Sequence, residues 1–448
     1  MNFSGAKPPA VHSDASNEAP TIDVATGRVS RESTKGCCMP DTLFLQFYNQ
    51  IKESYYDLCN GYSDTYDLCL SKGDFYWTQH ETDRSKWYDD ATYVDRKLPI
   101  DKGRIYISAI YSNHLYQAYI WAKAYPEIDF VVGGPVAAER TMVKGEWNPV
   151  YVAVDKNVVL PENLTITGKS LEDWFGVPNF SGKWKLALPD DISSNSRIYF
   201  SYTLDNRCYW KKCIYCNIAL HADEVFRERK RIDCEFADVD HAGVKIVRLN
   251  TGSITPKFLR EVLPVLPNRD DLDYRMFIRS GSVETRALEY ALKQLDGNIP
   301  NLVLGFGMEF PSNRMLKYAG KGFTTGELLE FLHLSKAYGL RINANFMLGW
   351  NNLVEDDLIE LEAFMAAMPE DAVTTAQIRW LLAHPFAQVH DTYEGEPIWM
   401  GPFYEGFRVS VDDGQKALNR QALEIVKKYS RVKNFEVQGL VSIREYMQ

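Results

Sequence analysis

The sequence predicts an α/β protein in which an N-terminal Rossmann-like domain is followed by a partial (β/α)6 barrel. At 448 residues the chain is longer than one ordinary domain, so we expect more than one hydrophobic core. With 45% hydrophobic and 25% charged residues, the composition is that of a globular protein. Two series of short apolar runs alternate with segments of helical spacing, the pattern that βα units require.

The first series lies in a predicted Rossmann-like domain of residues 41–175. Residues 1–40 are rich in Ser, Thr, Ala, Pro and Gly, and we expect them to be a disordered leader. A strand at 104–110, a helix at 115–125 and a strand at 130–135 imply a parallel pair. Strand-like runs at 151–154 and 163–167 continue the alternation.

The second series predicts the barrel, over residues 195–390. Its six strand-like runs cover residues 198–202, 244–249, 274–278, 302–305, 341–347 and 376–381. Helical segments between them cover residues 257–266, 285–295, 325–338 and 355–368. We expect residues 391–448 to form a C-terminal extension over the barrel opening, with an amphipathic helix at 414–429 and a short strand from Phe435.

Charge and hydropathy limit the partners. The formal net charge is −10 and no Lys/Arg-rich run stands out, so we expect no nucleic-acid partner. No apolar stretch is long enough to cross a membrane and no signal core begins the chain, which predicts a cytoplasmic protein without a membrane partner. A small-molecule or peptide substrate is the remaining expectation.

Three of the eight cysteines, Cys208, Cys213 and Cys216, share one short loop after the first barrel strand. In a reducing compartment metal binding or burial is a better default for thiols than a disulfide. A tetrahedral zinc site would need a fourth ligand, for which His221 and Cys234 are the nearest candidates. Three ligands alone suit an iron–sulfur cubane with one open iron, while three buried thiols remain the structural alternative.

This loop resembles that of the radical S-adenosylmethionine superfamily, in which three cysteines follow the first strand of a partial barrel. Tyr215 stands where that family commonly has an aromatic residue before the third cysteine. The gap from Cys208 to Cys213 is one residue longer than the usual spacing. The resemblance implies a 4Fe–4S cluster, S-adenosylmethionine as a second cofactor, and an electron donor such as flavodoxin or ferredoxin.

The resemblance extends to the ends of later barrel strands, where polar residues usually build the site. The run from Gly305 to Glu327 is similar to a motif that follows the fourth strand in many members. Glu309 could instead be a solvated carboxylate, and Arg279 could form an ordinary salt bridge. The positions that the resemblance assigns to cofactor binding are Tyr215, Asn250, Thr251, Gly252, Arg279, Gly307 and Glu309.

The N-terminal domain resembles the cobalamin-binding domain that precedes the barrel in one subgroup of the superfamily. The resemblance rests on Gly133, Gly134 and Pro135, which end a Val-Val strand where that subgroup faces the corrin edge. The same strand end also suits any flavodoxin-like sheet. A domain that has lost cobalamin is therefore the alternative.

From this resemblance we expect an enzyme that transfers an alkyl group, most simply methyl, to an unreactive atom in natural-product or peptide modification. One alternative is transfer of the 3-amino-3-carboxypropyl group without cobalamin. Another is a zinc or iron–sulfur module without catalysis. No motif in residues 380–448 names the substrate. Five residues could line the barrel mouth or could equally belong to the core: Trp380, His384, Phe386, Tyr404 and Phe407.

Overall fold

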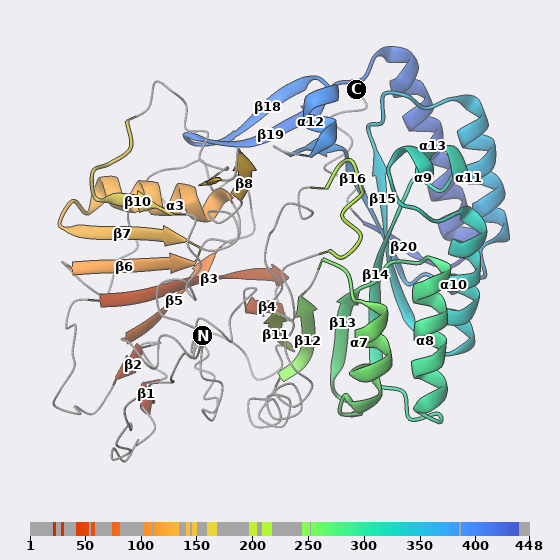
Figure 1. The fold of residues 1–448 in the computed structure, drawn as a ribbon, viewed down its shortest axis with the longest axis horizontal. Helices are drawn as coiled ribbons and strands as arrows, with labels where there is room; N and C mark the ends of the chain where they lie inside the picture. The colour runs from red at the N-terminus through yellow and green to blue at the C-terminus, as the bar shows by residue number, and fades with distance from the viewer. Residues whose placement is uncertain are drawn as a thin grey trace, which may run out of the picture.

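The structure is a computed structural model, and it describes two groups of parallel strands joined in one sheet (Figure 1). The described residues are 21–23, 28–30, 42–52, 55–58, 74–80, 103–108, 112–133, 140–143, 146–149, 159–167, 197–203, 208–216, 244–250, 252–384 and 387–438. Among them, no helix combines the length and the apolar character that crossing a membrane requires.

The N-terminal group is a run of parallel strands with one helix against it. Strands β5 (Asp74–His80), β3 (Thr42–Lys52), β6 (Gly103–Ser108), β7 (Ile128–Gly133) and β10 (Leu164–Ile166) pair in that order, all parallel. Helix α3 (Ser112–Ala124) connects β6 to β7, as the sequence predicted. It buries Trp121 against Phe130, with ring centroids 6.5 Å apart. The predicted strand at 151–154 lies outside the described residues.

The second group confirms all six strands of the predicted barrel series, and each is parallel to the next. The strands are β11 (Arg197–Thr203), β12 (Val244–Asn250), β13 (Asp273–Phe277), β14 (Asn301–Glu309), β15 (Arg341–Leu348) and β16 (Thr375–Trp380). Parallel strands are covered on both faces, which is why they read as apolar runs. The prediction of a mixed α/β protein with parallel sheets is therefore confirmed.

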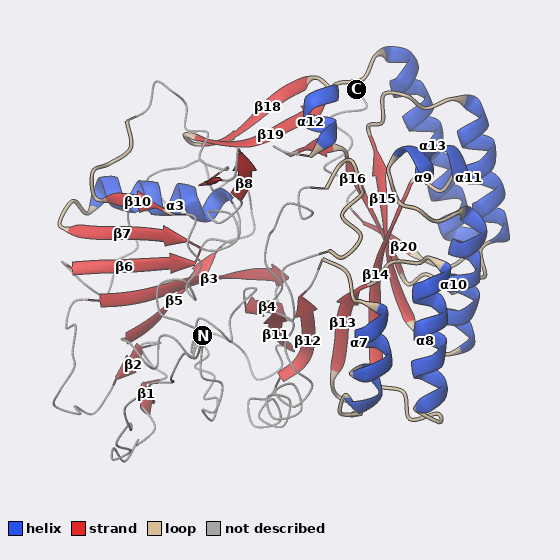
Figure 2. Ribbon diagram, viewed as in Figure 1, coloured by secondary structure: helices blue, strands red, loops and turns tan. Residues whose placement is uncertain are grey.

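Helices cover the outer face of this second group (Figure 2). They are α7 (Pro256–Glu261), α8 (Ser282–Gln294), α9 (Asn313–Tyr318), α10 (Thr325–Ala337), α11 (Glu355–Ala367) and α13 (Asp413–Val432). Helix α7 ends earlier than predicted and gives way to a 3-10 turn, η4 (Leu263–Val265). Pro264 has no backbone N–H and cannot continue a helical hydrogen-bond ladder.

Strand β4 (Tyr55–Leu58) joins the two groups, because it pairs antiparallel with β3 and parallel with β11. At the far edge, β20 (Glu436–Gln438) pairs with β16. The remaining short strands form two hairpin-like pairs: β1 (Thr21–Asp23) with β2 (Arg28–Ser30), and β8 (Arg140–Val143) with β9 (Glu146–Pro149).

A second connection, which the sequence did not predict, runs across the top of Figure 1. Strands β17 (Leu382–Ala383), β19 (Phe403–Val409) and β18 (Gly395–Met400) form an antiparallel sheet, with α12 (Gln388–Thr392) beside it. Both β18 and β19 contact α3 of the N-terminal group. Phe403 meets Tyr119 edge to face at 6.1 Å. The C-terminal part of the chain thus bridges the two groups.

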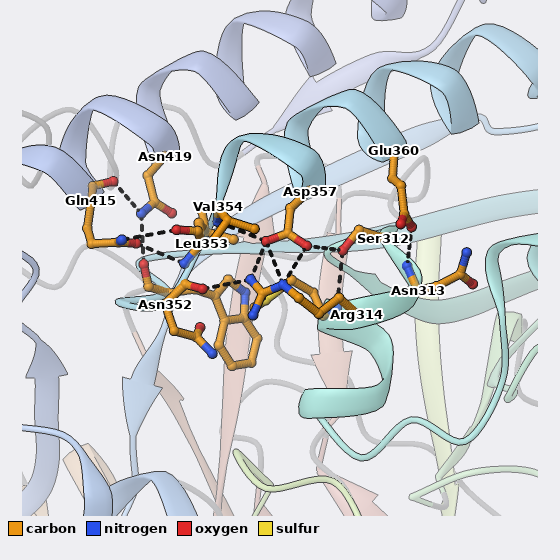
Figure 3. A network of polar contacts seen from close by, with 12 residues as sticks. Ser312, Asn313, Arg314, Asn352, Leu353, Val354, Asp357, Glu360, Gln415 and Asn419 are labelled. Carbon is orange, nitrogen blue, oxygen red and sulfur yellow. Dashed lines mark hydrogen bonds and ion pairs between the residues drawn. The ribbon is translucent and has the colours of Figure 1, made fainter.

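A polar network fastens the covering helices to the end of β15 (Figure 3). The buried Asp357 carboxylate accepts hydrogen bonds from Arg314, from the Ser312 hydroxyl at 2.7 Å and from the Val354 backbone at 3.0 Å. On α13, the fully buried Asn419 amide accepts from the Gly349 N–H at 2.7 Å. These bonds satisfy polar groups that would otherwise be buried without partners.

Candidate functional site

The three predicted cluster ligands lie on one described loop, residues 208–216, between β11 and β12. Cys208, Cys213 and Cys216 form no disulfide, and each is partly buried. Among the described residues, no three His, Cys, Asp or Glu side chains are gathered tightly enough to hold a metal ion as they stand. Whether the three thiols can bind one metal centre therefore depends on the contacts that fix the conformation of their loop.

The support is a turn at residues 319–322, between α9 and α10, whose carbonyl groups hold the cysteine loop. The Ile214 N–H donates to the Ala319 carbonyl at 3.2 Å. The Trp210 indole N–H donates to the Gly320 carbonyl at 2.6 Å. A further carbonyl, that of Lys321, accepts a 2.6 Å hydrogen bond from Arg279, which lies after β13. We call residues 319–322 the support turn.

Glycines let the support turn approach the loop closely. Gly320 and Gly322 both have positive φ angles, 73° and 67°, which L side chains rarely adopt. A Cβ at Gly320 would overlap the Lys212 carbonyl, and a Cβ at Gly322 would overlap the Trp210 ring. The turn therefore needs glycine at both positions for backbone geometry and for space.

Arg279 joins the loop to the end of β13. Its guanidinium lies 3.6 Å from the centre of the Trp210 ring and 3.5 Å from the Glu284 carboxylate. The Tyr209 hydroxyl donates to the same carboxylate. Burial, followed by that hydrogen bond, raises the pKa of Tyr209 well above its ordinary value. The predicted Arg279 is thus at the site, where it orders two aromatic residues of the cysteine loop.

A buried polar triad lies directly beneath the loop. The Tyr215 hydroxyl donates to Glu309 Oε1 at 2.7 Å, and Lys321 Nζ donates to the same oxygen at 3.1 Å. Lys321 also donates to the Tyr215 oxygen at 3.1 Å. The Lys321 and Glu309 side chains are only 9% and 8% exposed, so this ion pair is largely removed from water.

The triad shapes the ionisation of its members and of the neighbouring thiol. Burial alone would lower the pKa of Lys321, but the Glu309 carboxylate raises it, and the net pKa lies above its ordinary value. Burial, then Glu309, raises the pKa of Tyr215 well above its usual range, which keeps the hydroxyl protonated as a donor. Burial also raises the pKa of Cys213, and the Lys321 ammonium opposes that rise.

Two backbone features of β14 make room for the triad. Glu309 has a positive φ of 55°, and the register between β14 and β15 shifts between Gly307 and Glu309. A Cβ at Gly307 would overlap the Glu309 carboxylate. A non-glycine residue at positive φ is strained, and such strain concentrates at functional sites.

The structure thus brings together four of the predicted residues around the loop: Tyr215, Arg279, Gly307 and Glu309. Asn250 ends β12 and Gly252 lies just after it, at the neighbouring strand end. Gly133 ends β7 in the N-terminal group of strands. Thr251 and Gly134 lie outside the described residues.

Sequence reasoning missed the roles of Trp210 and Lys321. Both stood inside motifs that the sequence singled out, Trp210 between the cysteines and Lys321 in the run after the fourth strand. Nothing in either motif indicated that the two segments are in contact.

The predicted mouth residues are partly accounted for. The Trp380 indole donates to the Val409 carbonyl at 3.0 Å, and Phe407 packs beside His390 at 5.0 Å. Tyr404 lies within hydrogen-bonding distance of His390, at 3.0 Å. Helix α12, which carries His390, contacts the cysteine loop, because the Val389 N–H donates to the Ile214 carbonyl at 3.0 Å. Phe386 lies outside the described residues.

No family model matches the sequence, and no curated protein matches it. Solved structures do match the fold. One is the radical S-adenosylmethionine methyltransferase TsrM from Kitasatospora setae, solved with cobalamin and a 4Fe–4S cluster, at a TM-score of 0.55 and 11% identity. The match covers 90% of this chain and 94% of TsrM.

A second is OxsB, a cobalamin-dependent S-adenosylmethionine radical enzyme solved with aqua-cobalamin, at a TM-score of 0.51 and 13% identity. Here the match covers 87% of this chain and 56% of OxsB, so the chain spans little more than half of that protein. At the level of the fold, these neighbours confirm the resemblance inferred from the sequence.

Proposed function

We propose that this protein is a radical S-adenosylmethionine enzyme whose 4Fe–4S cluster is held by Cys208, Cys213 and Cys216. The observation that carries the proposal is the loop itself, which brings three cysteines outside any disulfide onto one segment held by hydrogen bonds to the support turn. In the same proposal, strands β11–β16 and their helices form a partial (β/α)6 barrel over residues 195–390. Residues 41–175 form a Rossmann-like domain.

The donor chemistry at the site fits such a cluster. Cubane clusters are held by Cys thiolates, and three thiols leave one iron for a further ligand. When bound, such a cluster supplies one-electron cleavage of a carbon–sulfur bond of S-adenosylmethionine, with the electron coming from flavodoxin or ferredoxin. The remaining requirement is a pocket for the sulfonium cofactor next to the loop.

Buried polar atoms near the loop support that pocket. Among the described residues, Arg279 Nε and the fully buried Ser280 hydroxyl have no hydrogen-bond partner. Buried polar groups without partners are rare in proteins, and a bound polar ligand is one way to satisfy them. Both atoms follow β13, at the strand ends where barrel enzymes build their sites.

Within this proposal the chain's residues have separate tasks. The cysteines hold the metal, Trp210 and Arg279 fix the loop, and the triad keeps the loop's inner side dry and ordered. The bridge made by β18, β19 and α12 limits access from one side. Exclusion of water protects reactive species from side reactions.

For the transferred group we propose methyl, with cobalamin bound in the N-terminal domain near Gly133 and Gly134. The support is the fold shared with TsrM and OxsB over both halves of the chain. The substrate would be a small molecule or a peptide, acted on in the cytoplasm.

Product analysis tests this function. The anaerobically reconstituted protein should consume S-adenosylmethionine in the presence of a reductant and a methyl acceptor, and release 5′-deoxyadenosine together with S-adenosylhomocysteine. 5′-Methylthioadenosine as the sole nucleoside would indicate aminocarboxypropyl transfer instead. A protein that lacks the visible absorption of an iron–sulfur cluster after reconstitution, and that retains zinc, would be a non-catalytic metal module.

A further inference from the structure

We infer that the buried Lys321–Glu309 ion pair sets the reduction potential of the metal centre on the cysteine loop, with Lys321 raising the potential and Glu309 lowering it. The inference rests on the proposed function, because it presupposes a redox-active cluster at Cys208, Cys213 and Cys216. It assigns an electrostatic role to two largely buried residues that make no hydrogen bond to the sulfur atoms in the contacts described above.

The position of the pair supports this role. Both charges meet at the Tyr215 hydroxyl, and Tyr215 lies between Cys213 and Cys216 in the loop. The Ile214 N–H donates to the carbonyl of Ala319, two residues before Lys321. The support turn that contains the Lys321 cation is therefore also hydrogen-bonded to the cysteine loop. A charge placed on the support turn therefore stays at a fixed place relative to the thiols.

Burial strengthens the electrostatic effect of the two charges on a nearby redox centre. The Lys321 and Glu309 side chains are about nine-tenths buried, and Phe323 and Tyr215 present their rings to the ammonium at 5.6 and 5.8 Å. The interaction between two charges grows as the effective dielectric constant falls, from about 80 in water to about 20 in and near a protein. A buried charge therefore acts on a nearby redox centre about four times more strongly than a solvated one at the same distance.

A purely structural purpose would not require this arrangement. A buried ion pair is weak support for stability, because desolvation of two charges offsets much of their attraction. Apolar side chains of similar volume could fill the space beneath the loop at similar stability. Strain at Glu309 and the glycine at position 307 are further costs of placing the carboxylate there.

The test uses isosteric variants of the full chain and an exposed control. Lys321→Met removes the buried cation, and Glu309→Gln removes the anion but keeps an acceptor for Tyr215. Lys212→Met removes an exposed cation next to Cys213 in the sequence. The Lys212 ammonium lies 4.7 Å from the centre of the Trp210 ring. Each protein is reconstituted anaerobically, and the midpoint potential of its cluster is measured by mediated titration with dithionite, followed by electron paramagnetic resonance.

We expect Lys321→Met to make the midpoint potential more negative and Glu309→Gln to make it more positive. Lys212→Met should shift the potential less than Lys321→Met does, because water screens the exposed charge. Shifts of opposite sign are not what a loosened loop would produce.

Potentials equal to wild type in both buried variants would overturn the inference, and so would shifts of the same sign in both. A folded Lys321→Met chain that assembles no cluster would also overturn it, because Lys321 would then be a structural support. If Lys321→Met does not fold, the sign of the Glu309→Gln shift decides alone. Failure of the wild-type protein to bind any cluster is a different result, which contradicts the proposed function.

Discussion

The indole N–H of Trp210 donates a 2.6 Å hydrogen bond to the carbonyl oxygen of Gly320, a residue 110 positions later in the chain. This bond joins the cysteine loop after β11 to the turn that follows α9. With the Ile214–Ala319 bond, it makes the loop's shape depend on the connection that follows β14 as well as on its own sequence. Substitutions in the support turn should therefore change the conformation of the cysteine loop.

Gly322→Ala tests this dependence. The substitution places a Cβ at a positive φ of 67° and against the Trp210 ring, so we expect a loss of about 2–3 kcal/mol in the free energy of unfolding. Iron incorporation should fall as well, because the displaced Trp210 can no longer hold the cysteine loop against the support turn. Denaturant titration and iron analysis after reconstitution measure the two effects.

Gly326→Ala is the matched control, four residues further along. Gly326 lies in the first turn of α10, and its added Cβ would meet only Thr324 Oγ1, at 3.7 Å. Alanine in a helix is favoured over glycine by about 0.5–1 kcal/mol, so this variant should be at least as stable as wild type. Equal effects of the two substitutions would contradict the contact between the turn and the loop.

Asp357 gives a prediction for pH. Burial works to raise its pKa, but hydrogen bonds from Arg314, the Val354 backbone and Ser312 outweigh burial and hold the pKa below its ordinary value. A carboxyl group whose pKa is depressed in the folded state contributes stability above its unfolded pKa of about 3.9, and loses it as the pH falls through the folded pKa. The free energy of unfolding should therefore decline below about pH 4.

Asp357→Asn should remove that part of the acid dependence and cost about 1.5–3 kcal/mol at neutral pH, because the hydrogen bonds to a buried, charged carboxylate are lost. Glu362→Gln is the control, since Glu362 pairs with Lys428 on the surface, where both side chains are about half exposed. An exposed pair contributes little to stability, because water screens its charges. If both variants lose the same stability and keep the same acid dependence, the network of Figure 3 does not have the role described.

The strands β11–β16 could be predicted because each is a short apolar run between helical segments, a local signal. The sheet of β17, β18 and β19 could not, because β17 has only two residues, and β18 and β19 carry charged and glycine residues that interrupt an apolar run. The cysteine spacing is likewise a local signal, and it is the basis of the ligand assignment that we propose. Contacts such as Trp210 with Gly320 and Glu309 with Lys321 depend on how the later strands pack, which no local pattern records.

Gly134 gives the prediction for the N-terminal domain, argued from the sequence. If the strand end at Gly133 and Gly134 lies against a corrin ring, only a residue without a Cβ permits close approach of the backbone. Gly134→Trp should then abolish cobalamin retention and methyl transfer, while cluster assembly stays at the wild-type level. Cobalamin absorption after reconstitution measures the first effect. A wild-type protein that binds no cobalamin and still consumes S-adenosylmethionine would mean that the domain has lost this function.

The central claim is that Cys208, Cys213 and Cys216 hold an iron–sulfur cluster, and the most direct measurement is iron and sulfide per chain after anaerobic reconstitution. We expect about four irons in the wild-type protein. The triple Cys208→Ala, Cys213→Ala, Cys216→Ala variant should hold almost none and keep a wild-type circular dichroism spectrum. Cys234→Ala, a cysteine outside the loop, should leave the iron content unchanged. Equal iron in the folded triple variant and the wild-type protein would contradict the claim.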